Sequence, residues 1–385
     1  MNIETNPRMM FAVNNNKIPD NITSLVEKVN ITMSENAITM IDIRSKSIDF
    51  FLNVNKYFSV GSELDVWMGW GNDLVYQASG IIMRHKPYMS GSESAEIELK
   101  CFDKLYQMSR TKKIRKWTEA SYTEIIDDIV SDYNFGRKVI SSFPYKKKNV
   151  VKKKEDTDYS YIEQLSNLTG RMFWCDKNIE TQTWNFYFTD ESPEQPMDYT
   201  LIRKNGDFIS VEPEYLIMEE QILDLKVYRY SGNNSWHLVS ELQDDLVFSS
   251  PGRISPATTN FHSYIRIGVG DLAFNIATNT RFMEEQDITN FARSWIRERR
   301  KNLIKLNSAR TVGLPYMRPM QTHKLDLTVL TNRDYTGSYY ISEVEHEMSN
   351  SGFFTTFKGR KVIDEIVTGA DVESYKESLA SQEDL

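Results

Sequence analysis

The sequence has little cysteine: its 385 residues include only Cys101 and Cys175. Two cysteines exclude a disulfide framework and a four-cysteine zinc site, so we expect two reduced thiols. No apolar run approaches the roughly 18 residues of a membrane-spanning helix. The first residues, MNIETNPRMMFAVNNN, also lack the apolar core of a secretory signal peptide. The sequence therefore predicts a protein that is made in the cytoplasm, is not exported by Sec and does not insert into a membrane.

An excess of basic charge is also missing. The chain carries 46 Lys and Arg against 54 Asp and Glu, which gives a net charge of −8. This balance disfavours a dedicated nucleic-acid-binding protein, although it leaves room for a local basic patch. The length predicts about two or three domains. Aromatic residues make up 12% of the chain and favour β structure.

The common catalytic motifs are absent as well. The sequence has no P-loop and no Gly-x-Ser-x-Gly elbow, and its five histidines are scattered. The segment Gly268–Ala273 matches Gly-x-Gly-x-x-Ala, but no long helix is expected to start there, so we interpret its glycines as a turn. Glu343, Glu345 and Glu347 alternate with His346 and indicate the exposed face of a strand rather than a metal site. We expect no enzyme activity, no metal and no cofactor.

Strands dominate both ends of the chain. In the first third, alternating apolar residues predict strands over Ile38–Ile43, Ser47–Val54, Glu63–Met68, Leu74–Met83 and Ala95–Phe102. In the last half, the same pattern predicts strands over Phe208–Pro213, Leu223–Tyr230, Trp236–Leu242, Lys324–Leu330 and Ser338–Met348. Spacings near ten residues, with glycines between the strands, are typical of a barrel or a sandwich.

The middle of the chain has a different pattern. Ser121 and Glu124 have the spacing of a capping box, which predicts the start of a helix. A second helix is predicted over Tyr159–Leu168, with Gly170 as its stop signal. Strands are expected to follow at Arg171–Cys175 and Thr183–Phe188. We therefore predict a β-rich α+β protein with four regions: a first β region at 1–105, an α+β insert at 106–204, a second β region at 205–363 with an amphipathic helix over Asp287–Lys305, and an acidic tail at 364–385.

Three charged segments are candidate binding sites. The first is a lysine run: Lys146, Lys147, Lys148, Lys152, Lys153 and Lys154. It predicts an exposed loop or strand edge, or an electrostatic surface that attracts phosphates or an acidic partner. The second is an arginine stripe on the predicted amphipathic helix, which faces solvent or a neighbouring subunit: Arg293, Arg297 and Arg300. The third is the acidic tail, expected to be disordered or to form a helix on a partner, with Asp364, Glu365, Asp371 and Glu373 as its first acids.

A series of ordered segments resembles one protein family. SVGSELDVWMGW at Ser59–Trp70 is similar to the opening of late-control protein D, the baseplate hub family of contractile phage tails, which is related to the hub part of VgrG. Further similar segments follow in the family's order: Cys101–Leu105, Lys116–Ile126, Tyr159–Leu165, Thr169–Trp174, Thr311–Pro315, Gly337–His346 and Gly352–Thr356.

The resemblance implies a homotrimer in the baseplate of a virion tail. Each subunit would contribute two tube-like antiparallel β-barrel domains, and the resulting pseudo-sixfold ring would join a sixfold tail tube to a threefold central spike. The ring would leave a channel for DNA. Tail tube and spike proteins are the implied partners, with tape-measure and wedge proteins as further candidates. The family's turns would be formed here by Gly61, Gly80, Gly170, Gly313 and Gly337.

Two other functions stay open on the sequence alone. A tail-associated peptidoglycan hydrolase would need a carboxylate pair in a cleft, and the 54 acids cannot be sorted for such a pair by their spacing. The insert is short for a complete hydrolase domain. A host-surface adhesin would more often contain repeats. The acidic tail stands where VgrG would continue into a spike, which indicates that the spike is a separate polypeptide.

Overall fold

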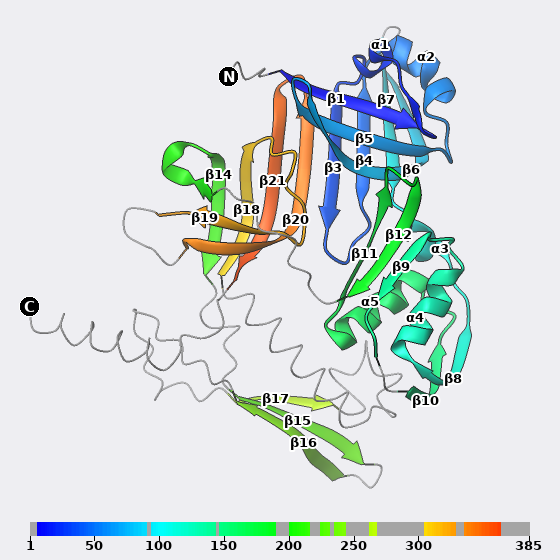
Figure 1. The fold of residues 1–385 in the computed structure, drawn as a ribbon, viewed down its shortest axis with the longest axis vertical. Coiled ribbons are helices and arrows are strands. Elements are labelled where there is room, and N and C mark those ends of the chain that lie inside the picture. Colours follow the sequence, from blue (N-terminus) through cyan, green and yellow to red (C-terminus); the bar gives the residue numbers. More distant parts are fainter. Residues whose placement is uncertain are drawn as a thin grey trace, which may run out of the picture.

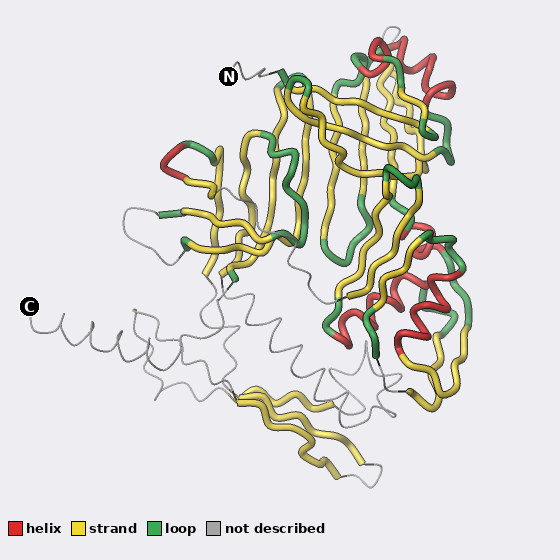
Figure 2. Tube along the Cα trace, viewed as in Figure 1, coloured by secondary structure: helices red, strands yellow, loops and turns green. Residues whose placement is uncertain are grey.

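The computed structural model describes residues 6–90, 94–143, 146–189, 200–215, 224–231, 235–243, 262–267, 304–328 and 335–362. Strands outnumber helices in these segments (Figure 2), and the predicted β-rich α+β class is confirmed. The helices are short: α1 (Asp20–Thr23), α2 (Ile48–Tyr57), α3 (Leu105–Arg110), α4 (Tyr122–Ser131), α5 (Asp158–Thr169) and a 3-10 turn at Arg203–Asn205.

One large sheet organises the molecule (Figure 1). Thirteen strands belong to it, and eleven of them form a path in the order β14 (Phe208–Tyr215), β18 (Ile304–Val312), β21 (Gly352–Lys361), β20 (Gly337–Ser349), β3 (Lys28–Ser34), β4 (Met40–Ser45), β7 (Ser94–Phe102), β6 (Asp73–Ser90), β5 (Glu63–Trp70), β1 (Pro7–Val13) and β2 (Asn16–Lys17). The remaining two, β19 (Thr322–Asp326) and β13 (Thr200–Ile202), branch from β20.

Strands from the two ends of the chain meet at the centre of this sheet. β20 pairs antiparallel with β3, and His346 lies opposite Ile31. The sheet curls, so that β1 and β5 run across the direction of β3, β4 and β7 (Figure 1). Both β regions predicted from the sequence therefore contribute to a single continuous sheet.

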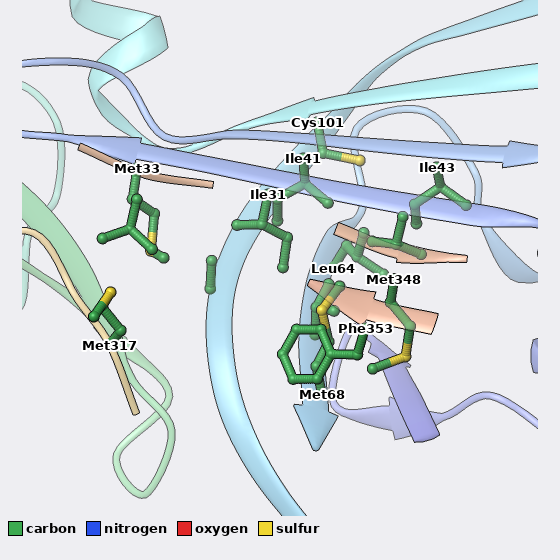
Figure 3. Close-up of a cluster of buried hydrophobic side chains, with 14 of the residues drawn as sticks. Ile31, Met33, Ile41, Ile43, Leu64, Met68, Cys101, Met317, Met348 and Phe353 are labelled. Carbon is green, nitrogen blue, oxygen red and sulfur yellow. The ribbon is translucent and has the colours of Figure 1, made fainter. Parts of the chain in front are cut away.

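The curled sheet encloses one hydrophobic core. Ile31, Ile41, Leu64, Met348 and Phe353 gather in it from strands of both regions (Figure 3), and each is at most 2% exposed. Burying one such side chain contributes about 1.5–3 kcal/mol. The shared core therefore binds the N-terminal and C-terminal strands into one folding unit.

Residues between β7 and β13 form a compact insert with its own core. Its strands are β8 (Arg115–Ser121), β9 (Arg137–Ile140), β10 (Lys146–Lys152), β11 (Met172–Asn178) and β12 (Thr183–Thr189). β10 pairs with β8, and the other three form a separate sheet in the order β11-β12-β9. The buried residues of this second core run from Leu105 to Phe188.

A further sheet contains β15 (Asp224–Ser231), β16 (Ser235–Gln243) and β17 (His262–Ile267).

The local signals read in the insert are confirmed. The Ser121 hydroxyl accepts the N–H of Glu124, and the Glu124 carboxylate accepts the N–H of Ser121, which completes the predicted capping box of α4. α5 ends at Gly170, which has φ of 66°, the left-handed conformation that favours glycine at a helix end. The two strands predicted after it are β11 and β12.

One predicted element is wrong, and a second is wrong only at its last residues. Ser47–Val54 is not a strand, because Ser47 caps α2 by accepting the N–H of Phe50. Phe50 and Val54, four residues apart, are buried, while Leu52 is 72% exposed, so burial follows the period of a helix. A short apolar run in the sequence does not distinguish a helix from a strand. The helix predicted over Asp287–Lys305 does not reach its expected end, because Ile304 begins β18; the segment before residue 304 lies outside the described residues. The structure adds β1, β18 and β21, which were not predicted as strands.

The glycines predicted as turns play different parts. Gly61 has φ of 88° in the turn before β5, and Gly337, with φ of 151°, begins β20. Gly80 is not a turn: it lies inside β6, where an added Cβ would stand 3.1 Å from the Cβ of Cys101. Gly313 ends β18, and a Cβ there would fall 2.2 Å from the ring of Phe353. These last two positions need glycine because other chain segments approach closely.

Candidate functional site

The tip of the β3–β4 hairpin fastens the insert to the large sheet. Asn36 has φ of 53°, and its side-chain oxygen accepts the N–H of Phe173 on β11 at 2.8 Å. Its backbone oxygen accepts the Tyr159 hydroxyl of α5 at 2.6 Å. The preceding residue, Glu35, accepts bonds from Arg360 at 2.8 Å and from the Tyr340 hydroxyl at 2.9 Å. This hairpin therefore links β20, β21 and the insert.

A buried ion pair makes a second connection, which we call the junction pair. Lys177 on β11 is 3% exposed, and its ammonium lies 3.0 Å from the carboxylate of Asp65 on β5, which is 1% exposed. Glu63 also contacts this ammonium at 2.9 Å and accepts the Trp184 indole N–H at 3.0 Å. The Ser79 hydroxyl donates to Asp65. The signal in the sequence is weak, because Lys177 lies two residues beyond the predicted strand Arg171–Cys175; in the structure it shares the buried face of β11 with Phe173 and Cys175.

A cavity of about 210 Å³ lies beside the junction pair. Its lining includes Tyr76, Asp103, Trp174, Asp176 and Arg318, from both the large sheet and the insert. Burial raises the pKa of Asp103 to about 7. The Asp103 oxygens accept backbone N–H groups at the start of α3 and ahead of β4, at 3.0 and 2.7 Å. This carboxyl therefore holds two chain segments in place.

His346 is a buried structural residue. It is fully buried on β20, one ring nitrogen lies 3.0 Å from the Thr355 hydroxyl, and the other lies 3.1 Å from the backbone oxygen of Met317. Burial lowers its pKa to about 3, and the nearby Arg318 acts in the same direction. The glutamates that alternate with it are partly exposed, as the strand pattern predicted. In the described part of the chain, no group of three His, Cys, Asp or Glu side chains is arranged to hold a metal ion.

The position of His346 predicts a pH dependence of stability. Its pKa is about 3 in the folded state against an ordinary value of 6.5, so its contribution is complete above about pH 6.5 and is lost as the pH falls toward 3. Between pH 6 and pH 4 the wild type should lose about 2 kcal/mol of unfolding free energy more than His346→Gln does. Urea unfolding of both proteins at each pH measures this difference, and parallel pH profiles would contradict it.

The predicted lysine run forms part of a two-stranded surface, which we call the basic ribbon: β8, β10 and the following Lys153 and Lys154. Val150 and Lys152 face inward. The expectation that the whole run is exposed is wrong at Lys152, which has no exposed surface. Its ammonium lies 2.9 Å from the carboxylate of Asp158, which is also fully buried. The sequence could not separate Lys152 from its neighbours because the strand's orientation depends on its pairing.

The remaining cations of the run differ in their surroundings. Lys153 and Lys154 are exposed, and Lys146 is an exposed residue 3.8 Å from Glu124. Lys147 and Lys148 belong to β10. The other predicted binding residues lie outside the described residues: Arg293, Arg297, Arg300, Asp364, Glu365, Asp371 and Glu373. The turn predicted at Gly268–Ala273 also lies outside them.

The large sheet ends in two edges that sequence patterns did not reveal. Among the described strands, β14 pairs only with β18, and Pro7–Met10 of β1 pair only with β5. The Phe11 carbonyl faces away from β5, because it accepts the N–H of Ile18. Residues two apart on a strand direct their backbone groups to the same side, so the N–H of Met9 also faces this outer edge. Such edges can pair with another chain.

None of the described helices is long and apolar enough to cross a membrane. A family model described as the Alg8 N-terminal domain matches residues 7–186, which is less than half of the chain and does not assign it to that family. No curated protein matches the chain.

Several solved structures share the fold. The 43 kDa tail protein of prophage MuSo2 from Shewanella oneidensis superposes with a TM-score of 0.65 at 10% identity, over 92% of this chain and 98% of that chain. A tail protein from Neisseria meningitidis MC58 gives 0.61 at 11% identity, over 92% and 96%. The Escherichia coli protein c3393, described as a type VI secretion component similar to the T4 tail proteins gp27 and gp5, gives 0.56 at 11% identity, over 93% and 77%. The chain therefore has the fold of these tail proteins.

Proposed function

We propose that this protein is the baseplate hub of a contractile phage tail or of a related injection apparatus. One observation carries the proposal: the similarity to tail proteins covers 92% of this chain and nearly all of the two phage-type tail proteins. Because the match covers nearly the full length of both chains, this protein shares the complete architecture of those tail proteins and not only one common domain. The role is structural, and the protein's location is the baseplate of the tail.

The large sheet supports a ring built from three copies. Each chain contributes two strand-rich halves joined at β20 and β3, so that three chains present six such halves. A ring of this kind can match a sixfold tail tube on one side and a threefold spike on the other. The outer edges at β14 and β1 are suited to pair with the neighbouring copies, and closure of the ring leaves a channel for DNA. Tail tube and central spike proteins are the partners.

The ring can be tested through its proposed sheet edge. Met9→Pro removes a backbone N–H that faces outward while leaving the bonds of β1 to β5 in place. We expect the wild type to have the mass of three chains in light scattering, with a central hole in negative stain. Met9→Pro should remain a folded monomer. The matched control Met9→Ala loses the same side chain but keeps the N–H, and should still form the trimer.

The possible outcomes separate two parts of the proposal. A trimer of Met9→Pro would show that β1 does not close the ring and leave the hub role in place. A wild-type protein that stays monomeric with its tail tube and spike proteins present would contradict the hub itself.

A further inference from the structure

The outer face of the basic ribbon carries charge that none of the described residues neutralises. Lys116 on β8 is exposed and lies opposite Val151 of β10, which is 43% exposed. Ile114, just before β8, is 68% exposed. Lys116, Lys153 and Lys154 form no ion pair with any acid that the structure describes. Within the described residues, three ammonium groups without an ion pair thus belong to the same ribbon as two exposed apolar side chains.

The inner face of the ribbon is different, because Arg115 and Lys152 both form ion pairs there. Arg115 contacts Asp128 at 3.1 Å and also Asp132, and Lys152 contacts the buried Asp158. The ring of Trp117 stacks on Tyr161 of α5 at 6.0 Å between ring centroids. The only aromatic side chain of β8 therefore faces the insert core, and the described residues of the outer face include no ring on which a nucleotide base could stack.

The C-terminal segment of the same protein has the complementary chemistry. Residues 364–385 contain seven carboxylates and a single lysine. Val372, Tyr375 and Leu379 recur in this segment at intervals of three and four residues. The segment thus combines an excess of negative charge with regularly spaced apolar residues, and the ribbon presents the opposite charge around apolar side chains.

We propose that residues 364–385 bind the outer face of the basic ribbon. Carboxylates of the segment lie beside Lys116, Lys153 and Lys154, and its apolar side chains cover Ile114 and Val151. Covering these two side chains removes apolar surface from water, which a DNA backbone on the same lysines would not do. In an assembly of several copies, this contact lets the C-terminal segment of one chain hold the insert of another. The inference does not depend on the hub role.

Carbodiimide cross-linking of the full-length protein tests the contact directly, because this reagent joins an amine to a carboxylate only where they touch. Mass spectrometry should find Lys116, Lys153 or Lys154 linked to Asp371, Glu373 or Glu377. The variant Lys116→Glu/Lys153→Glu/Lys154→Glu removes both the positive charge and the reactive amines, so tail links at these three positions should disappear. Because the amines themselves are gone, the charge-swap variant described below is the test of the contact. Mixing ¹⁵N-labelled with unlabelled protein tells whether a link joins one chain or two.

A matched control changes the same charge elsewhere. Lys56→Glu/Lys204→Glu/Lys324→Glu alters three lysines that are also exposed, and should leave the yield of tail links through the ribbon unchanged. Adding Glu373→Lys and Glu377→Lys to the ribbon variant should restore links, now from tail lysines to ribbon glutamates. Tail carboxylates that link elsewhere, or to nothing, would overturn the proposal. Links that disappear on addition of a short duplex DNA that binds the ribbon would assign the surface to DNA instead.

Discussion

Replacing Lys177 with alanine is expected to lower the free energy of unfolding by about 3–5 kcal/mol, because the substitution leaves a buried carboxylate without its cation. Asp65 is 1% exposed, and Lys177 is its only ionic partner among the described residues. Replacing the pair with apolar residues, in Lys177→Met/Asp65→Leu, should recover much of the loss, since no charge then remains buried.

Denaturant unfolding measures this effect, and hydrogen exchange locates it. The amides of β11 should exchange faster in Lys177→Ala, because the junction pair holds β11 against β5. Lys46→Ala removes an exposed ion pair with Glu27 and should leave the unfolding curve almost unchanged. Equal effects of Lys177→Ala and Lys46→Ala would show that the junction pair does not fasten the insert.

Lys152 and Lys153 are adjacent lysines with very different expected effects. Lys152→Ala removes the cation that lies 2.9 Å from the fully buried Asp158, and should cost about 3–5 kcal/mol. The same ammonium donates to the backbone oxygens of Lys113 and Asp156, at 2.9 and 2.8 Å, and those bonds are lost with it.

Lys153→Ala is the matched control, since its side chain is exposed and forms no described ion pair. Thermal unfolding of both variants beside the wild type makes the comparison, and Lys153→Ala should change little. A stable Lys152→Ala with a destabilised Lys153→Ala would mean that β10 pairs with β8 in a register shifted by one residue, because such a shift moves every side chain to the opposite face.

The proposed hub role gives these two ion pairs a consequence for assembly. The junction pair and the Asn36 contacts fix the insert against the large sheet. Lys116, Lys153 and Lys154 on the basic ribbon are exposed. An insert that keeps its orientation can present its surface at a defined place in an assembly. Loss of the junction pair would therefore impair assembly even if the sheet edges remained intact.

Local signals in the sequence were sufficient for several elements. A capping box at Ser121 and Glu124 marks the start of α4, and Gly170 marks the end of α5. Both signals act through residues within one helical turn, so these two helix termini could be predicted. The β-rich class followed from alternating apolar residues, which report directly on strand geometry. Ser47–Val54 shows where this reasoning ends, because a short apolar run fits both a strand and a buried helix face.

The sequence by itself thus determined the fold class, the capped helices of the insert and the presence of a lysine run. Only the tertiary structure decided that Lys152 is buried while Lys153 is exposed, that Lys177 meets Asp65 from 112 residues away, and that β20 pairs with β3 across most of the chain. The physical reason is the range of the interactions. A cap or a turn depends on a few neighbouring residues, whereas a buried ion pair and a sheet register depend on where the whole chain has placed two remote segments.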